Sequence, residues 1–209
     1  MTQTVVLASR NAGKIRELAV LLEPFGVTVL GLDAFPQIGE IEETGTTFAE
    51  NSLLKASTVS EATGLIAVAD DSGLVVDALG GEPGVYSARY SEEPGKPADD
   101  ERNIVKVLEK MKNVPDGKRS VRFVSVMAAA APGGRHIIAE GTWEGILARE
   151  KAGTNGFGYD PVFFDAETGL TAAQMEPQQK NARSHRAKAC AKLLELWPGF
   201  WEEVGAGKK

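Results

Sequence analysis

The chain has 209 residues, 43% of them hydrophobic and 25% charged, which predicts a single globular domain over residues 1–209 or two closely fused lobes. Its formal net charge of −6 argues against a nucleic-acid polymer as partner, yet a few clustered cations suffice for a small phosphate ligand. No apolar run is long enough for a membrane span, there is no signal-peptide pattern, and one cysteine, Cys190, excludes an internal disulfide; we therefore expect a cytoplasmic protein.

The first third of the chain alternates expected strands and helices. Apolar runs at residues 4–8 and 27–30 predict buried strands, and a helical apolar period over residues 13–23, stopped by Pro24, predicts a helix between them. Thr47 and Glu50 have the spacing of a capping box, which starts a helix that ends at Gly64. Two further apolar runs predict strands at residues 65–69 and 75–79.

The rest of the chain follows a different pattern. A Pro-rich acidic segment, residues 90–100, is expected to be a surface loop before a helix over residues 99–112. Extended segments at residues 121–131 and 135–146 predict an antiparallel hairpin around Pro132-Gly133-Gly134, and a last helix is expected over residues 181–196. This order predicts an α/β protein with a mixed sheet.

A polar turn joins the first expected strand to the first helix, with the sequence Ser9-Arg10-Asn11-Ala12-Gly13-Lys14. A helix N-terminus offers free N–H groups and a positive dipole end, and both suit a phosphate. The turn is not a Walker A loop, because its first glycine is missing and Ile15 follows Lys14. Taken alone, it is better interpreted as an ordinary capped turn.

Acidic residues follow a buried strand in the sequence Asp70-Asp71-Ser72-Gly73. Carboxylates beyond the end of a strand suit Mg²⁺, and one of them is a candidate general base. Because adjacent residues of an extended chain point in opposite directions, we expect one carboxylate to face the site. A turn is an equally good interpretation. A second acidic group precedes the capped helix and contains Glu40, Glu42 and Glu43, with a solvated loop as its alternative.

Three further segments are candidates for ligand binding. In the glycine-rich segment before Tyr90, Ser87 and Arg89 are candidate polar contacts, with Arg89 as a phosphate clamp. A glycine-rich stretch sets aromatic residues between glycines in Gly156-Phe157-Gly158-Tyr159-Asp160, where a base could stack on Phe157, although Tyr159 could instead close over the core. The basic segment that includes Lys180, His185 and Arg186 opens the last helix and is suited to an anion, or is a solvated face.

Taken together, these segments resemble the inosine triphosphate pyrophosphatase family, whose members act on dITP and XTP. The resemblance covers nearly the whole chain in order. The matching motifs are Ser9-x-Asn11-x-x-Lys14, Glu42-Glu43-Thr44-Gly45, Thr47-Phe48-x-Glu50-Asn51, Asp70-Asp71-Ser72-Gly73-Leu74, Gly84-x-Tyr86-Ser87-Ala88-Arg89, Gly156-Phe157-Gly158-Tyr159-Asp160-Pro161 and Ser184-His185-Arg186. Each motif is weak by itself, and their common order is specific. Ser52 is a small departure, since the family more often has Ala there.

The resemblance implies a fold, a site and a reaction. The fold is a long mixed sheet with flanking helices that form two lobes around a central cleft, in a homodimer. Asp71 would bind Mg²⁺ and act as the base, and Glu42 would be a second metal ligand. The implied nucleotide-binding residues are Ser9, Arg10, Asn11, Ala12, Gly13, Lys14, Ser72, Phe157, Gly158, Tyr159, Asp160, Lys180, His185 and Arg186. The implied reaction converts ITP, dITP or XTP to the monophosphate and pyrophosphate, with a donor such as Lys180 or Arg186 selecting a 6-oxo purine.

Other functions remain open on the residues alone. A regulatory nucleotide-binding module would share the glycine-rich loops and the basic residues but would not need Asp71. A single-stranded RNA binder would use Phe157 and the basic segment, although the acidic total weakens this reading. A general nucleotide phosphatase would release free phosphate in place of pyrophosphate.

Overall fold

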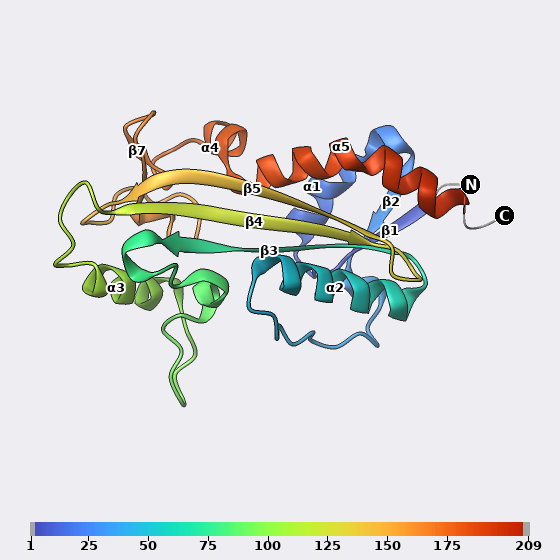
Figure 1. Ribbon diagram of the computed structural model, residues 1–209, viewed down its shortest axis with the longest axis horizontal. Helices are drawn as coiled ribbons and strands as arrows, with labels where there is room; N and C mark the ends of the chain where they lie inside the picture. The colour runs from blue at the N-terminus through green and yellow to red at the C-terminus, as the bar shows by residue number, and fades with distance from the viewer. Residues whose placement is uncertain (1–2, 207–209) are drawn as a thin grey trace. The chain divides into compact units, whose positions relative to one another are not determined.

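The computed structural model describes residues 3–206. Its strands form a mixed seven-stranded sheet in the order β2-β1-β3-β4-β5-β6-β7 (Figure 1). The strands are β1 (Gln3–Leu7), β2 (Val27–Leu30), β3 (Ile66–Val76), β4 (Ser120–Ala130), β5 (His136–Leu147), β6 (Phe163–Asp165) and β7 (Leu170–Thr171). Strand β1 pairs in parallel with β2 and β3, whereas β6 is antiparallel to β5 and β7. The predicted mixed sheet is therefore confirmed.

The α-helices begin and end at local sequence signals. They are α1 (Ala12–Leu22), α2 (Phe48–Thr63), α3 (Asp100–Lys110), α4 (Pro177–Arg183) and α5 (His185–Ala206). Asn11 caps α1, and Pro24 lies in the 3₁₀ turn Glu23–Phe25 that follows it. The capping box of Thr47 and Glu50 is present at α2, which ends at Gly64 in the left-handed conformation. Within residues 3–206, a bilayer-spanning helix is absent, since none combines the required length and apolarity.

The chain divides into two compact units. Within the described residues, unit 1 comprises the chain up to Asp71, Val126–Glu140 and the chain from Ala189 onward, and unit 2 comprises Ser72–Ser125 and Gly141–Lys188. The chain therefore passes from unit 1 to unit 2 inside β3, at Asp71–Ser72. The single domain over residues 1–209, its alternative of two fused lobes and the cleft between lobes all stay predictions.

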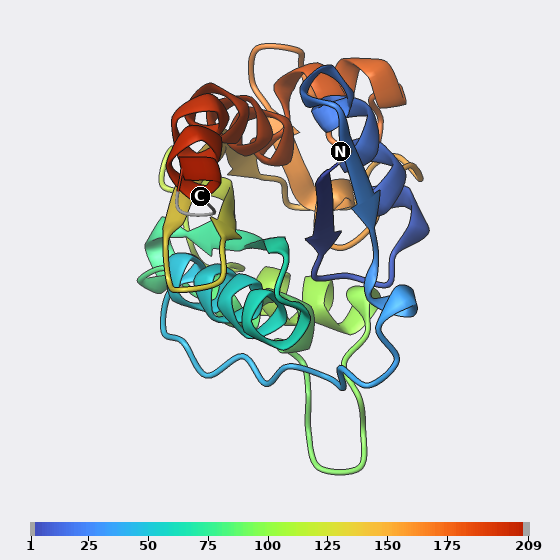
Figure 2. The same cartoon turned by 90° about the vertical axis from the view of Figure 1, so that its right-hand side faces the viewer.

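Unit 1 packs helices on both faces of its part of the sheet. Helices α1 and α5 cover one face and α2 covers the other (Figures 1 and 2). The strand residues alternate accordingly: Val5 and Val68 belong to the cluster with α1 and α5, whereas Val6 and Ala67 pack with Val59 of α2. Cys190 is buried in the first cluster, where it packs among apolar side chains.

Unit 2 has its own apolar core. Ile104 and Val107 of α3, with Met111 at its C-cap, pack in one cluster with the second half of β3, the first half of β4 and the end of β5. The spacing of these three residues is helical, as the expected helix over residues 99–112 required. Strands β6 and β7 are too short for their apolar pattern to stand out in the sequence, and they were not predicted.

Strand β3 corrects one expectation. It is a single strand through Asp70-Asp71-Ser72-Gly73, where two strands at residues 65–69 and 75–79 were expected, and residues Asp77–Leu79 form a 3₁₀ turn. Gly73 is needed for close packing here, since a Cβ at this position would lie 2.3 Å from Ser87 Oγ. That hydroxyl accepts from Leu74 N–H at 2.8 Å. The turn interpretation of this segment is therefore wrong.

The last expected helix is also corrected. It is two helices, α4 and α5, that meet at Ser184, and α5 runs to Ala206 instead of residue 196. Ser184 has extended backbone angles, and its Oγ accepts from Ala187 N–H at 3.2 Å, which caps the start of α5. The basic segment that was expected to open one helix therefore spans the junction of two.

Candidate active site

In unit 1, the two acidic residues of β3 pair with lysines from different helices. Lys14 of α1 donates to both carboxylate oxygens of Asp70 at 2.9 Å. Lys55 of α2 lies with its Nζ 3.6 Å from Asp71 Oδ1. Because successive strand residues point to opposite faces, and α1 and α2 cover opposite faces, each carboxylate meets a different helix.

Lys55 links Asp71 to a second carboxylate. Its ammonium group donates to Glu43 Oε1 and to the Asp70 carbonyl oxygen, both at 2.8 Å. The other oxygen of Asp71 accepts from Asn51 Nδ2 at 3.2 Å. Asn51 is itself fixed, because it is fully buried and its Oδ1 accepts from Gly45 N–H at 2.8 Å. The Asp71 carboxylate is therefore held at both oxygens, with 11% of its side chain exposed.

This cluster has the donors that a divalent cation needs. The carboxylates of Glu43 and Asp71, which come from different segments of the chain, lie on the same ammonium group of Lys55. Among the residues that the structure describes, no group of three or more His, Cys, Asp or Glu side chains is placed to hold a metal ion. Mg²⁺ does not need such a group, because it usually binds through one or two carboxylates and completes its shell with water and phosphate oxygens. The residues present fit such an ion.

The structure places Glu43, not Glu42, in the Asp71 cluster. Glu42 is exposed, whereas the Glu43 carboxylate makes an ion pair with Lys55. Sequence reasoning named Glu43 as an alternative but overlooked Lys55. The available signal was spacing: Asn51 and Lys55 are four residues apart on the capped helix and so share one of its faces.

The polar turn at α1 is a capped helix start. Asn11 Oδ1 accepts from the N–H groups of Gly13 and Lys14 at 2.8 and 3.1 Å, and Ser9 Oγ accepts from Asn11 N–H at 3.1 Å. Arg10 donates to the Ile38 carbonyl oxygen at 2.7 Å, which directs its guanidinium toward that loop. Asn11, Ala12 and Gly13 are exposed. The predicted cap is thus present, whereas the role of the turn in phosphate binding stays a prediction.

In unit 2, Phe157 is an exposed aromatic ring beside a cation. Its side chain is 66% exposed, and Lys180 Nζ of α4 lies 5.3 Å from the ring centroid. The carboxylate of Asp160 is buried and accepts both from Phe157 N–H, at 2.9 Å, and from Lys180. Gly156 has a φ of +79°, which favours glycine and lets the loop close over Asp160. Asp160 therefore fixes the loop and the lysine together.

The neighbouring residues support this loop from inside. Gly158 N–H donates to Asp100 Oδ2 at 2.7 Å. Tyr159 lies in the core, as its alternative interpretation held, and its hydroxyl donates to the Ser87 carbonyl oxygen at 2.9 Å. Burial raises the pKa of Tyr159, so this hydroxyl stays neutral. Ser87 is buried too, and its predicted role as an exposed polar contact is wrong.

The basic segment provides a histidine against an aromatic stack. The His185 ring stacks on Phe123 with centroids 4.9 Å apart, and Phe123 stacks on Phe163 at 4.4 Å. His185 and Arg186 are both half-buried at the start of α5, and Ser72 is half-buried at the start of unit 2 in β3. Unit 2 therefore brings Lys180, Asp160 and Phe157 together, and it fixes the His185 ring by packing.

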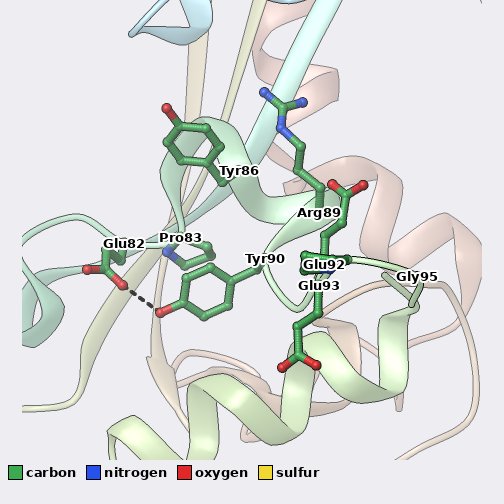
Figure 3. A pocket seen from close by; sticks show the side chains of 9 residues that line it. Glu82, Pro83, Tyr86, Arg89, Tyr90, Glu92, Glu93 and Gly95 are labelled. Carbon is green, nitrogen blue, oxygen red and sulfur yellow. Dashed lines mark hydrogen bonds between the residues drawn. The ribbon is translucent and has the colours of Figure 1, made fainter. Parts of the chain in front are cut away.

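A separate pocket of about 800 Å³ lies in unit 2 around Tyr86 and Arg89 (Figure 3). The Arg89 guanidinium lies 5.2 Å from the Tyr86 ring centroid. The lining also contains the acidic residues Glu82, Glu92 and Glu93, whose charge disfavours a polyphosphate. Apart from Arg89, none of the predicted contact residues lines this pocket. The geometry therefore favours the Lys14 and Lys55 clusters over this pocket as phosphate contacts.

Known proteins match this chain over nearly its whole length. The model of the Ham1 family matches residues 5–196. The chain belongs to the Ham1 family. A curated relative from Nitratidesulfovibrio vulgaris, named dITP/XTP pyrophosphatase, is 62% identical over 95% of this chain and 97% of its own length. A relative of the same name from Bacillus cereus is 48% identical over 94% of this chain and 96% of its own.

Solved structures of the family share this fold. The Ham1 protein of Coxiella burnetii has a TM-score of 0.87 at 42% identity, covering 95% of this chain and 100% of its own. The Staphylococcus aureus Ham1 protein has a TM-score of 0.86 at 40% identity, covering 94% and 99%. These likenesses confirm the resemblance that the motifs indicated and the fold of this Ham1-family protein.

Proposed function

We propose that this Ham1-family protein hydrolyses non-canonical purine nucleoside triphosphates, such as ITP, dITP and XTP, to the monophosphate and pyrophosphate. The observation that carries the proposal is the Asp71 carboxylate, held by Asn51 and Lys55 beside the carboxylate of Glu43. Relatives named dITP/XTP pyrophosphatase, matched over nearly their whole length, support the substrate class. The activity would remove these nucleotides from the cellular pool.

Each residue of the unit 1 cluster has a part in the proposed reaction. Asp71 accepts the proton of a water whose oxygen attacks the α-phosphorus, and the bond from that phosphorus to the bridging oxygen breaks as pyrophosphate leaves. Lys14 neutralises charge on the triphosphate. Bound Mg²⁺, held by Asp71 and Glu43, would neutralise further phosphate charge. Glu43 replaces Glu42 in this proposal because of its ion pair with Lys55.

Unit 2 would supply recognition of the base. A purine would stack on the exposed Phe157 ring, and the neighbouring Lys180 ammonium group is the proposed donor to its edge. A 6-oxo group accepts a hydrogen bond from that donor, whereas the 6-amino group of ATP leaves it unsatisfied. Such a mismatch costs on the order of 1–3 kcal/mol per buried group. His185 and Arg186 are proposed as further contacts of the same nucleotide.

Product identification tests the proposal. The purified protein is incubated with Mg²⁺ and, separately, with ITP, XTP, ATP and GTP, and the products are separated by chromatography. We expect monophosphate and pyrophosphate from ITP and XTP, with ATP nearly untouched and activity lost in EDTA. Exclusion of GTP, which also has a 6-oxo group, would require a further element at purine position 2. Free phosphate as the product would instead indicate a general phosphatase. No turnover of any nucleotide would overturn the enzyme in favour of a binding module.

Assembly and compartment are separate proposals. A homodimer is supported by the family resemblance, and sedimentation of the protein at micromolar concentration tests it. A cytoplasmic location is supported by the single buried thiol of Cys190, and fractionation of the source cells tests it.

A further inference from the structure

The junction of α4 and α5 places two of the proposed nucleotide contacts on either side of one residue. Ser184 ends α4 through its N–H, which donates to the Lys180 carbonyl oxygen at 2.9 Å, and its hydroxyl caps α5. Lys180 belongs to the last turn of α4, and His185 is the first residue of α5. The direction of both side chains therefore depends on how this junction is held.

Arg183, the residue before Ser184, is anchored to a buried carboxylate. Asp165 is 2% exposed, and its Oδ2 accepts from Arg183 Nε at 2.7 Å and from Trp143 Nε1 at 2.9 Å. Its Oδ1 accepts from the N–H groups of Glu167 and Thr168 at 2.8 and 3.2 Å. Burial alone would raise the pKa of Asp165, but these hydrogen bonds outweigh it and lower the pKa, so the anchor stays charged.

His185, the residue after Ser184, is tied to the same anchor by aromatic packing. Its ring stacks on Phe123, Phe123 stacks on Phe163, and Trp143 packs on Phe163 with centroids 4.8 Å apart. Trp143 then donates to Asp165. All of these residues belong to unit 2. Arg183, on one side of the junction, is thus connected to the Asp165 carboxylate by an ion pair. His185, on the other side, is connected to it through the stacked rings and Trp143.

We propose that Asp165 is a positioning residue that, through Arg183 and Trp143, holds the α4–α5 junction so that His185 and Lys180 meet the nucleotide. The inference rests on the proposed function, because it concerns contacts of that same site. Asp165 does not touch substrate in this role; it acts through the two side chains that it binds. Glu167 also pairs with Arg183, at 2.5 Å, but its side chain is 81% exposed, so solvent screens the pair. Glu167 therefore provides the matched control.

The first experiment needs no substrate. The chain has two histidines, His136 and His185, so their ring-proton NMR signals can be assigned from one His136→Gln variant. The Phe123 ring current shifts the His185 signals, and this shift reports the stack. We expect Asp165→Asn and Arg183→Gln to move the His185 signals, while His136 stays unchanged and Glu167→Gln moves neither. An unmoved His185 signal in folded Asp165→Asn would overturn the proposal.

The second experiment separates positioning from folding. In Asp165→Asn we expect the KM for ITP to rise roughly 10-fold while kcat stays within about 2-fold of the wild-type value. The variant displaces the nucleotide contacts Lys180 and His185 but leaves the catalytic base Asp71 unchanged. A purely structural role would lower the folded fraction, which reduces kcat per mole of protein and leaves KM unchanged. The double variant Asp165→Asn/Arg183→Gln should have a KM no higher than that of either single variant, because both substitutions break the same Asp165–Arg183 ion pair.

The two experiments distinguish the two proposals. If the wild-type protein turns over no nucleotide, the proposed function fails, and the NMR signals still decide whether Asp165 positions His185. If ITP is hydrolysed and KM is the same in Asp165→Asn and Glu167→Gln, the positioning role is refuted while the enzyme stands.

Discussion

Lys14 donates to both carboxylate oxygens of Asp70 at 2.9 Å, although the two residues are 56 positions apart in the chain. The Asp70 side chain is 8% exposed and that of Lys14 is 31% exposed, so the lysine compensates a buried charge and still reaches solvent. Asp71, the next residue, is compensated by Lys55 from the other face. Two adjacent acids thus have separate cationic partners, and only Asp71 belongs to the Glu43 cluster.

Replacement of Lys14 by Met should weaken triphosphate binding and destabilise the fold together. The lost cation raises the KM for ITP, and loss of its ion pair with the buried Asp70 carboxylate costs about 1–3 kcal/mol of unfolding free energy. The double variant Lys14→Met/Asp70→Asn separates these effects, because it removes the buried charge: urea unfolding should recover, whereas KM should stay high. Arg16→Met, at an exposed position of the same helix, is the control for a lost surface charge. Recovery of KM in the double variant would show that Lys14 acts only on the fold.

The variant Asp71→Asn should lose turnover and keep nucleotide affinity. The amide has nearly the same shape but is a poor base, so kcat should fall by about 10²- to 10⁴-fold. Pyrophosphate release measures kcat, and calorimetric titration with ITP measures affinity. Asp77→Asn, an exposed acid that pairs with Arg122, is the control and should retain activity. Equal loss of affinity and turnover would assign Asp71 to binding.

Gly156→Ala and Gly158→Ala form a matched pair of variants. Both positions have a positive φ, of +79° and +57°, so the backbone strain is similar. A Cβ at Gly156 would lie 2.0 Å from Asp160 Oδ2, whereas a Cβ at Gly158 meets nothing within 4 Å. We therefore expect Gly156→Ala to displace Asp160 and raise the KM for ITP well beyond the effect of Gly158→Ala. The same KM in both variants would mean that strain, not the position of Asp160, matters.

Lys180→Gln should reduce the discrimination between ITP and ATP. A glutamine amide can still donate to Asp160, so the loop keeps its anchor, but its oxygen can accept from a 6-amino group. The ratio of kcat/KM for ITP over ATP should fall by about 10-fold. Lys188→Gln, an exposed lysine at the start of α5, should leave the ratio unchanged. An unaltered ratio in Lys180→Gln would move the selection to another residue, such as Arg186.

The Asp165 carboxyl should make stability depend on pH in the acid range. Its pKa is lower in the folded protein than in the unfolded chain, so the folded state binds fewer protons there. Its contribution is present above the unfolded pKa and is lost as the pH falls through the folded one. The stability difference between wild type and Asp165→Asn, from urea unfolding, should thus shrink as the pH is lowered. A difference that is constant with pH would contradict this account.

Local signals predicted the fold well where a few neighbouring residues decide it. The capping box of Thr47 and Glu50, the stop at Pro24 and the left-handed Gly64 are all decided within one turn of chain. The continuity of β3 and the break at Ser184 were not predicted. Both lie in surroundings built by distant residues, since Lys14 and Ser87 bind β3 and Asp165 binds Arg183 just before the break, and a local pattern does not reveal such contacts.

The candidate site was predicted unevenly for the same reason. Motifs indicated Asp71, Phe157 and Lys180, because an acid beyond a strand suits a cation, an aromatic ring between glycines can stack on a base, and a basic segment suits an anion. They missed Lys55, which reads as one more surface lysine until α2 is packed beside β3. The choice of Glu43 over Glu42 likewise requires knowing which of two adjacent acids meets that lysine.

The alternation along β3 constrains the length of the segment more than its composition. Insertion or deletion of one residue between Ile66 and Asp70 would exchange the faces of the two acids, so that Asp71 would meet α1 and Asp70 would meet α2. Apolar substitutions in this stretch change only packing. During evolution, insertion of a single codon in this stretch should therefore be selected against even at times when substitutions of Ala67 or Val68 are tolerated.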